Sequence, residues 1–169
     1  MKVNWEELFA RFHGRRVLKY ALYMFLALLC QNMLFSRLRF LGVCPMVLPA
    51  VAVAVGMVEG SSWGAVFGLL MGIFADMAFL ENTILFTVAF PVIAFAAGFV
   101  THFYINQRFF AFMGVSAAGL LAMAVLQMLG TFARDVWSAD MLLTAFLQTL
   151  WSLPLAALAY FPPAKWIRK

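Results

Sequence analysis

Few residues of this chain carry side chains suited to acid–base or nucleophilic chemistry. Its two histidines, His13 and His102, lie in the N-terminal arm and near the end of the fourth apolar run, so we do not expect them to meet. No paired-histidine spacing, HExxH, GxSxG or Walker motif occurs in the sequence. We therefore predict a protein without enzymatic activity, cofactor or metal.

Two carboxylates lie within or beside the apolar runs. Glu59 ends the second run, and Asp76 lies about 14 residues into the third, roughly 21 Å along a helix. We expect them in opposite halves of a bilayer, where they cannot form an acid–base pair. Asp76 still needs a partner, because a carboxylate is costly in hydrocarbon. One interpretation is that Asp76 stabilises the bundle from within, either protonated or bonded to Thr87 or Gln127. The other is that it binds a partner helix or a coupling ion.

Asp76 also ends a ladder of glycines. Gly60, Gly64, Gly68 and Gly72 precede it at intervals of four residues in an otherwise apolar segment. Every fourth residue of a helix lies on one ridge, so these positions form a flat groove in which another helix can approach closely. The groove packs either against a neighbouring helix of this chain or against an external partner.

The composition indicates a membrane protein. Apolar residues make up 66% of the chain and charged residues only 11%, with 19 Phe, 11 Met and 5 Trp. A soluble domain of this length would need a charged shell that these residues cannot supply. The apolar runs are continuous rather than alternating, which favours helices over a barrel. A nucleic-acid partner is excluded because no basic face on a soluble surface is available.

The apolar runs number six, each about the length that crosses a bilayer. They are residues 17–36, 43–59, 62–80, 83–105, 109–133 and 141–161, the last closed by Pro162 and Pro163. We predict an all-α integral membrane protein with a single six-helix transmembrane domain at 17–163. An interfacial arm at 1–16 precedes this domain, and a basic tail at 164–169 follows it.

Basic residues predict the orientation. With six spans, one side carries nine lysines and arginines and the other side three. The positive-inside rule then places both termini in the cytoplasm. The nine are Lys2, Arg11, Arg15, Arg16, Lys19, Arg108, Lys165, Arg168 and Lys169, and the three are Arg37, Arg39 and Arg134.

The N-terminal arm has its own pattern. Trp5, Leu8, Phe9 and Phe12 fall on one face of a helix, which predicts a short helix lying on the membrane surface and in contact with its lipids. It is either a plain anchor or a helix that docks a partner.

Other polar residues in the spans have ordinary interpretations. Gln31, Asn32, Gln127 and Gln148 are expected to form hydrogen bonds between helices. Cys30 and Cys44 flank the first outer loop and are either small apolar fillers or a disulfide.

The order of several of these residues resembles the rod shape-determining protein MreD family. The resembling elements are Gly42-Val43-Cys44-Pro45 before an apolar span, then Glu59-Gly60, then Gly64, Gly68 and Gly72, and then Asp76. Gln31 near the end of the first span, the chain length and the six-span plan fit as well. Met46 departs from the family, which often has an acidic residue after the proline, and Pro49 is unusually early in its span.

The resemblance implies a non-enzymatic subunit of the bacterial cell-elongation machinery in the cytoplasmic membrane. Its partners would be an MreC-like protein, a RodA-like glycan polymerase and a class B transpeptidase, with MreB filaments on the inner side. The fold would be similar to the S-component fold of energy-coupling-factor transporters. Partner contact or helix packing would use Gln31, Pro45, Glu59, Gly60, Gly64, Gly68, Gly72 and Asp76.

An S component that binds a vitamin is the alternative function, because its size, helix count and fold are similar. S components usually carry an Ala-x-x-x-Ala pattern on the first helix, whereas here Ala21 and Ala27 do not fit that spacing. The outer loops are also short for a vitamin lid, although Trp137 and the aromatic-rich spans could line a small pocket. A small channel is less well supported, since no ring of charges or filter-like loop occurs.

Overall fold

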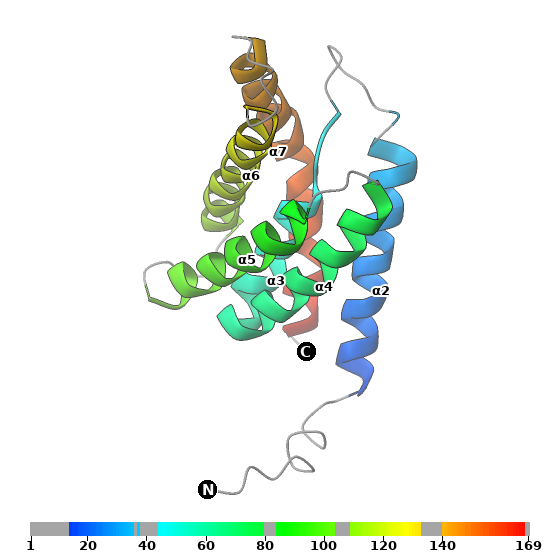
Figure 1. Ribbon diagram of the computed structural model, residues 1–169. Coiled ribbons are helices and arrows are strands. Elements are labelled where there is room, and N and C mark those ends of the chain that lie inside the picture. Colours follow the sequence, from blue (N-terminus) through cyan, green and yellow to red (C-terminus); the bar gives the residue numbers. More distant parts are fainter. Residues whose placement is uncertain are drawn as a thin grey trace, which may run out of the picture.

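The computed structural model describes residues 14–35, 37, 44–79, 84–103, 109–132 and 140–167. Every regular element within these ranges is a helix, as predicted. In chain order they are α2 (Gly14–Cys30), the π-helix η1 (Gln31–Phe35), α3 (Leu48–Glu59), α4 (Ser61–Phe79), α5 (Leu85–Phe103), α6 (Phe109–Phe132) and α7 (Asp140–Ile167) (Figure 1).

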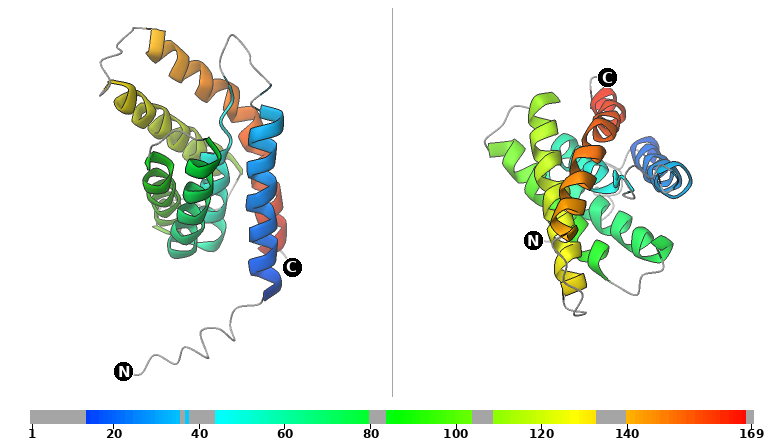
Figure 2. Two further views of the ribbon diagram at one scale, coloured as in Figure 1. Left: turned by 45° about the vertical axis from the view of Figure 1, so that its right-hand side comes forward. Right: turned by 90° about the horizontal axis from the view of Figure 1, so that it is seen from above.

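The short helix α3 is the centre of the bundle. Its residues 48–57 are all buried, and α4, α5, α6 and α7 each pack against it (Figure 2). A helix that is apolar on every side has to be enclosed in this way. The longer helices around it expose many large apolar side chains on their outer faces, which suits contact with lipid.

Five of the described helices are long and apolar enough to cross a membrane, which confirms a multi-pass membrane protein in outline. They contain Val17–Phe35, Ser61–Ala78, Leu85–His102, Phe109–Met128 and Leu143–Pro163. The start of α2 and the end of α7 lie at the same end of the bundle (Figures 1 and 2). That the two termini face the cytoplasm stays a prediction from the charge bias.

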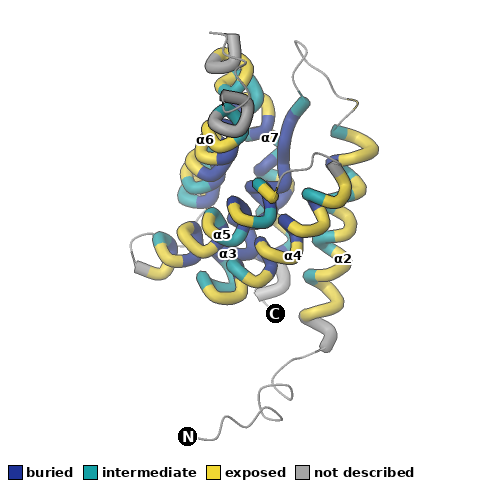
Figure 3. Tube along the Cα trace, in the orientation of Figure 1, coloured by how far each residue is buried: buried dark blue, intermediate teal, exposed yellow. Residues whose placement is uncertain are grey.

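The prediction of one continuous second helix over 43–59 is wrong. α3 has only 12 residues, about 18 Å of helix, and residues 44–47 before it are not helical. Residues 45–47 are nevertheless buried, and this segment adds about 10 Å of chain (Figure 3). α3 alone is shorter than the ~30 Å of a hydrocarbon core and is not among the helices long enough to cross a membrane, so the sixth span stays a prediction.

The prediction that Pro162 and Pro163 end the last helix is also wrong. α7 contains both residues, as well as Pro154, and continues to Ile167, so the tail predicted at 164–169 begins as helix. Because proline has no N–H, each of these residues leaves the carbonyl four positions earlier without its helical donor. For one of these carbonyls, that of Ala159, the structure shows another donor.

Most of the predicted arm lies outside the described residues. Helix α2 begins at Gly14, within the range assigned to the arm, while the residues of the interfacial pattern are not described. They are Trp5, Leu8, Phe9 and Phe12.

Helix α2 stands at the edge of the bundle and is the least enclosed of the five candidate spans (Figures 2 and 3). Only 11% of its span is buried, against 22–39% in the other four. Packing area therefore holds α2 weakly, and specific contacts have to fix its position.

Candidate functional site at the interrupted second span

The interruption of the second span follows from two prolines four residues apart. In a continuous helix the carbonyl of Pro45 would accept a hydrogen bond from the N–H of residue 49, and Pro49 has none. Pro49 lies instead in the first turn of α3, where a missing N–H does no harm. Residues 44–47 therefore enter the bundle without helical hydrogen bonds, and peptide groups left unpaired inside a membrane protein are unfavourable.

Gln31 pairs two of these peptide groups. Its Nε2 donates to the carbonyl of Pro45 and its Oε1 accepts from the N–H of Val47, both at 2.9 Å. Gln31 is buried and is the first residue of the π-helix η1, a type of irregularity that often marks a functional position. One carboxamide thus provides a donor and an acceptor to the backbone of this segment, as a neighbouring β-strand would.

A serine from α7 pairs a third peptide group. The hydroxyl of Ser152 accepts from the N–H of Met46 at 2.9 Å, and donates to the carbonyl of Gln148 in its own helix at 2.6 Å. Residues 44–47 are therefore held between η1 on one side and α7 on the other.

Helix α2 also donates a hydrogen bond to a second carbonyl that lacks its helical donor because of a proline. In α7, Pro163 leaves the carbonyl of Ala159 without its helical donor, and the hydroxyl of Tyr23 donates to that oxygen at 2.6 Å. Tyr23 also stacks against Phe67 of α4. The edge helix is therefore attached to the bundle by hydrogen bonds whose acceptors two prolines have made available.

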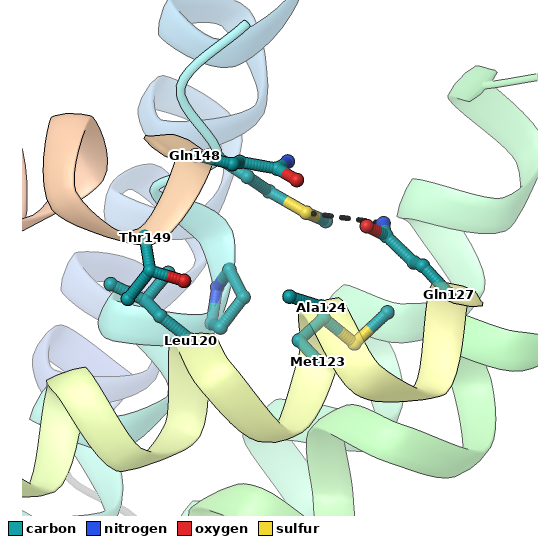
Figure 4. A pocket seen from close by; sticks show the side chains of 8 residues that line it. Leu120, Met123, Ala124, Gln127, Gln148 and Thr149 are labelled. Carbon is teal, nitrogen blue, oxygen red and sulfur yellow. Dashed lines mark hydrogen bonds between the residues drawn. The ribbon is translucent and has the colours of Figure 1, made fainter. Parts of the chain in front are cut away.

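A small cleft opens beside the interrupted span, between α3, α6 and α7. Its volume is about 190 Å³, part of which is open space outside the cleft. The side chains of Gln127 and Gln148 lie on opposite sides of it (Figure 4), and Gln127 Nε2 donates to the sulfur of Met46. The other residues that line it are Pro49, Leu120, Met123, Ala124 and Thr149.

Three glycines of the predicted ladder pack against helices of the same chain. An added Cβ would lie 2.5 Å from the Cα of Gly56 at Gly64, 2.7 Å from the Phe90 carbonyl oxygen at Gly68, and 2.5 Å from the Phe86 carbonyl oxygen at Gly72. Of the two interpretations left open, the structure shows the internal contact: α3 and α5 of the same chain lie against the ridge at these three positions.

The remaining glycine of the ladder has a different role. Gly60 is not on the ridge but joins α3 to α4, with a φ of 94° that favours glycine and its N–H bonded to the carbonyl of Gly56. Gly56 and Gly98, which lie outside the four-residue pattern, complete the close contact, since a Cβ at either would meet backbone of the facing helix.

Asp76 caps the neighbouring helix. Its carboxylate accepts from the N–H of Phe86 at 3.2 Å and from the N–H and hydroxyl of Thr87 at 2.8 and 2.5 Å. These are the first N–H groups of α5, which have no helical acceptor, and the carboxylate also faces the positive end of the helix dipole. Of the alternatives left open for Asp76, the structure shows the bond to Thr87.

Glu59 forms a second link to α2. The hydroxyl of Tyr20 donates to Glu59 Oε1 at the last residue of α3, and the ring of Tyr20 contacts Phe67 edge-on. Pro45 and Gln31, expected as possible partner contacts, are buried in the bundle and bonded to each other. They therefore act as internal packing positions.

Cys30 and Cys44 are free thiols in the structure, so the disulfide alternative is not supported. Among the described residues, no group of three or more His, Cys, Asp or Glu side chains is arranged to hold a metal ion.

Comparisons with protein-family models, with curated proteins and with solved structures find no match to this chain. Its function therefore has to be argued from its own residues and from the resemblance in sequence pattern.

Proposed function

We propose that this chain is a non-enzymatic scaffold subunit of the bacterial cell-elongation complex, resembling MreD. It would lie in the cytoplasmic membrane with both termini inside the cell. Its helices would contact an MreC-like protein, a RodA-like glycan polymerase and a class B transpeptidase, and so support cell shape and peptidoglycan synthesis.

The observation that carries this proposal is the filled interior of the bundle. The central helix α3 is buried along residues 48–57, and buried side chains and close helix contacts fill the space around it. A subunit that acts by presenting fixed surfaces to partners needs such a rigid body, because its contacts depend on where its helices are held.

The size of the cleft supports a scaffold over an S component. Sites for small molecules such as vitamins generally have about 300–1,000 Å³. The cleft beside Met46 has room for about one water molecule, which is too little to enclose a ligand of that size.

Affinity purification from the native membrane in mild detergent tests the proposal. We expect the tagged protein to recover the MreC-like protein, the polymerase or the transpeptidase of the same cell, identified by mass spectrometry. Recovery of paired ATPases with a membrane coupling subunit would overturn the proposal and support the S-component alternative.

A further inference from the structure

Helix α2, at the edge of the bundle, is attached more firmly at one place than along the rest of its length (Figure 2). Residues 17–30 are all half-buried or exposed, whereas Gln31, at the junction with η1, is buried. The bonds from Tyr20 and Tyr23 lie eleven and eight residues earlier, about 16 and 12 Å along the helix. The two tyrosines and Gln31 therefore hold α2 at separate levels.

The Gln31 end of α2 is the firmer attachment. Its carboxamide pairs the buried carbonyl of Pro45 and the buried N–H of Val47, and its departure would remove both of these bonds inside the bundle. Gln31 also begins the π-helix η1, and helices kink at such π-turns because the regular hydrogen-bond ladder is interrupted there. Gln31 is therefore both an anchor and a place where the span can bend.

The tyrosine contacts are weaker attachments. Glu59, which accepts from Tyr20, is half-buried at the last residue of α3, so solvent can replace the hydroxyl when it leaves. Tyr23 would give up one bond, to the carbonyl of Ala159. Both tyrosine rings lie against Phe67 of α4, and lipid chains can replace such apolar contacts because a bilayer supplies no hydrophobic force between helices.

The helices behind α2 are held differently. α3, α4 and α5 touch backbone to backbone, since a Cβ added at Gly64, Gly68 or Gly72 would lie no more than 2.7 Å from a backbone atom of the facing helix. Backbone contacts of this kind leave no side chains that could adjust to a shift of one helix against another. α2 can therefore change its position while α3, α4 and α5 keep theirs.

We propose that α2 is a hinged helix that pivots at Gln31. In the closed state, which is the state of the structure, Tyr20 and Tyr23 hold α2 against the bundle. In the open state, the part of α2 before Gln31 swings into the lipid and uncovers the ring of Phe67 and the carboxylate of Glu59. The bundle thus has two alternative faces on this side. The hinge is a property of this chain alone, so it does not depend on the proposed scaffold function or on any partner.

Distances between pairs of spin labels test the hinge. One label replaces either Leu18, which is 70% exposed and far from the pivot, or Met33, which is 66% exposed and close to it. Its partner replaces Val92 on α5, which is 63% exposed. The labels are attached to introduced cysteines in protein that carries Cys30→Ala and Cys44→Ala, in phosphatidylcholine nanodiscs. With both tyrosines present, we expect the closed distance to dominate from both positions.

Removal of the two hydroxyls should open the hinge. Tyr20→Phe and Tyr23→Phe keep the rings, and each should raise the ratio of open to closed protein about three- to twentyfold, the range of one interhelical hydrogen bond. The double variant should raise this ratio further and show a second, open distance from position 18. From position 33 it should keep the distance of the parent, because the pivot stays in place and the bundle stays folded.

Two results would overturn the hinge. A double variant that keeps the single closed distance from position 18 would show that packing alone holds α2 in place. Equal broadening of the distances from positions 18 and 33 would show that α2 leaves the bundle as a whole or that the bundle loses its structure, and either excludes a pivot at Gln31.

Discussion

Gln31 donates a hydrogen bond to the carbonyl of Pro45, in place of the backbone N–H that Pro49 lacks. The acceptor is a buried carbonyl that a helix would normally pair with residue 49, and the donor comes from another span. Tyr23 repeats the relationship eight residues earlier in the same span, donating to the carbonyl of Ala159 that Pro163 leaves free. In a bilayer, where apolar surface gives little preference between helix and lipid, these two bonds help the bond from Tyr20 to Glu59 to fix the edge helix.

Replacement of Gln31 by Leu should therefore be strongly destabilising. It leaves the Pro45 carbonyl and the Val47 N–H buried without partners, at about 1–3 kcal/mol for each group. We expect a marked fall in the thermal unfolding temperature of the purified protein in detergent. Met33→Leu, at a position 66% exposed on the same π-helix, is the matched control and should be neutral.

Tyr23→Phe should loosen another attachment of α2. The substitution keeps the ring that packs against Phe67 and removes only the hydroxyl that bonds to Ala159, so we expect a loss of about 1–3 kcal/mol from the unpaired carbonyl. Hydrogen exchange of the α7 backbone around residue 159 measures the effect locally. Exchange as slow as in the parent would show that the freed carbonyl needs no external donor.

Two buried serines should respond in opposite ways to alanine. Ser152 accepts from the N–H of Met46, whereas the hydroxyl of Ser116 is fully buried in α6 and has no hydrogen-bond partner among the residues that the structure describes. We expect Ser152→Ala to destabilise the protein by about 1–3 kcal/mol. Ser116→Ala should be neutral or stabilising, since it removes a polar atom that burial disfavours. Equal effects of the two substitutions in thermal unfolding would contradict this account of residues 44–47.

Glycine to alanine substitutions should likewise separate two positions. At Gly68 even one methyl group would lie 2.7 Å from the Phe90 carbonyl oxygen, so Gly68→Ala has to push α4 away from α5. At Gly114 an added Cβ would have no described neighbour within 4 Å, so Gly114→Ala should stabilise α6 by up to about 1 kcal/mol through helix propensity alone. The measurement is the yield of monodisperse protein and its unfolding temperature. A Gly68→Ala protein as stable as the parent would mean that the two helices are not in backbone contact.

The sequence predicted the helical class, five of the spans and the packing role of the glycine ladder, because continuous apolar runs and regular small residues report directly on helices in lipid. It did not predict the interruption before α3, since the run from Val43 to Val58 reads as uniformly apolar. The early Pro49 was the available signal. Gln31 and Tyr23 could be recognised as donors only once the fold had placed them beside Pro45 and Ala159, positions far away in the chain.

Asp76→Ala separates a capping role from a partner-binding role for this carboxylate. It removes three hydrogen bonds at the start of α5, and loss of a helix cap typically reduces stability by about 0.5–2 kcal/mol. Thr87→Val removes only the hydroxyl bond, so the double-mutant cycle of the two positions should show coupling in the unfolding free energy. If Asp76→Ala instead kept the stability of the parent while it prevented recovery of the polymerase or the MreC-like protein, Asp76 would act on a partner. The geometry favours the cap, because the carboxylate already accepts three bonds from α5 and has little capacity left for another chain.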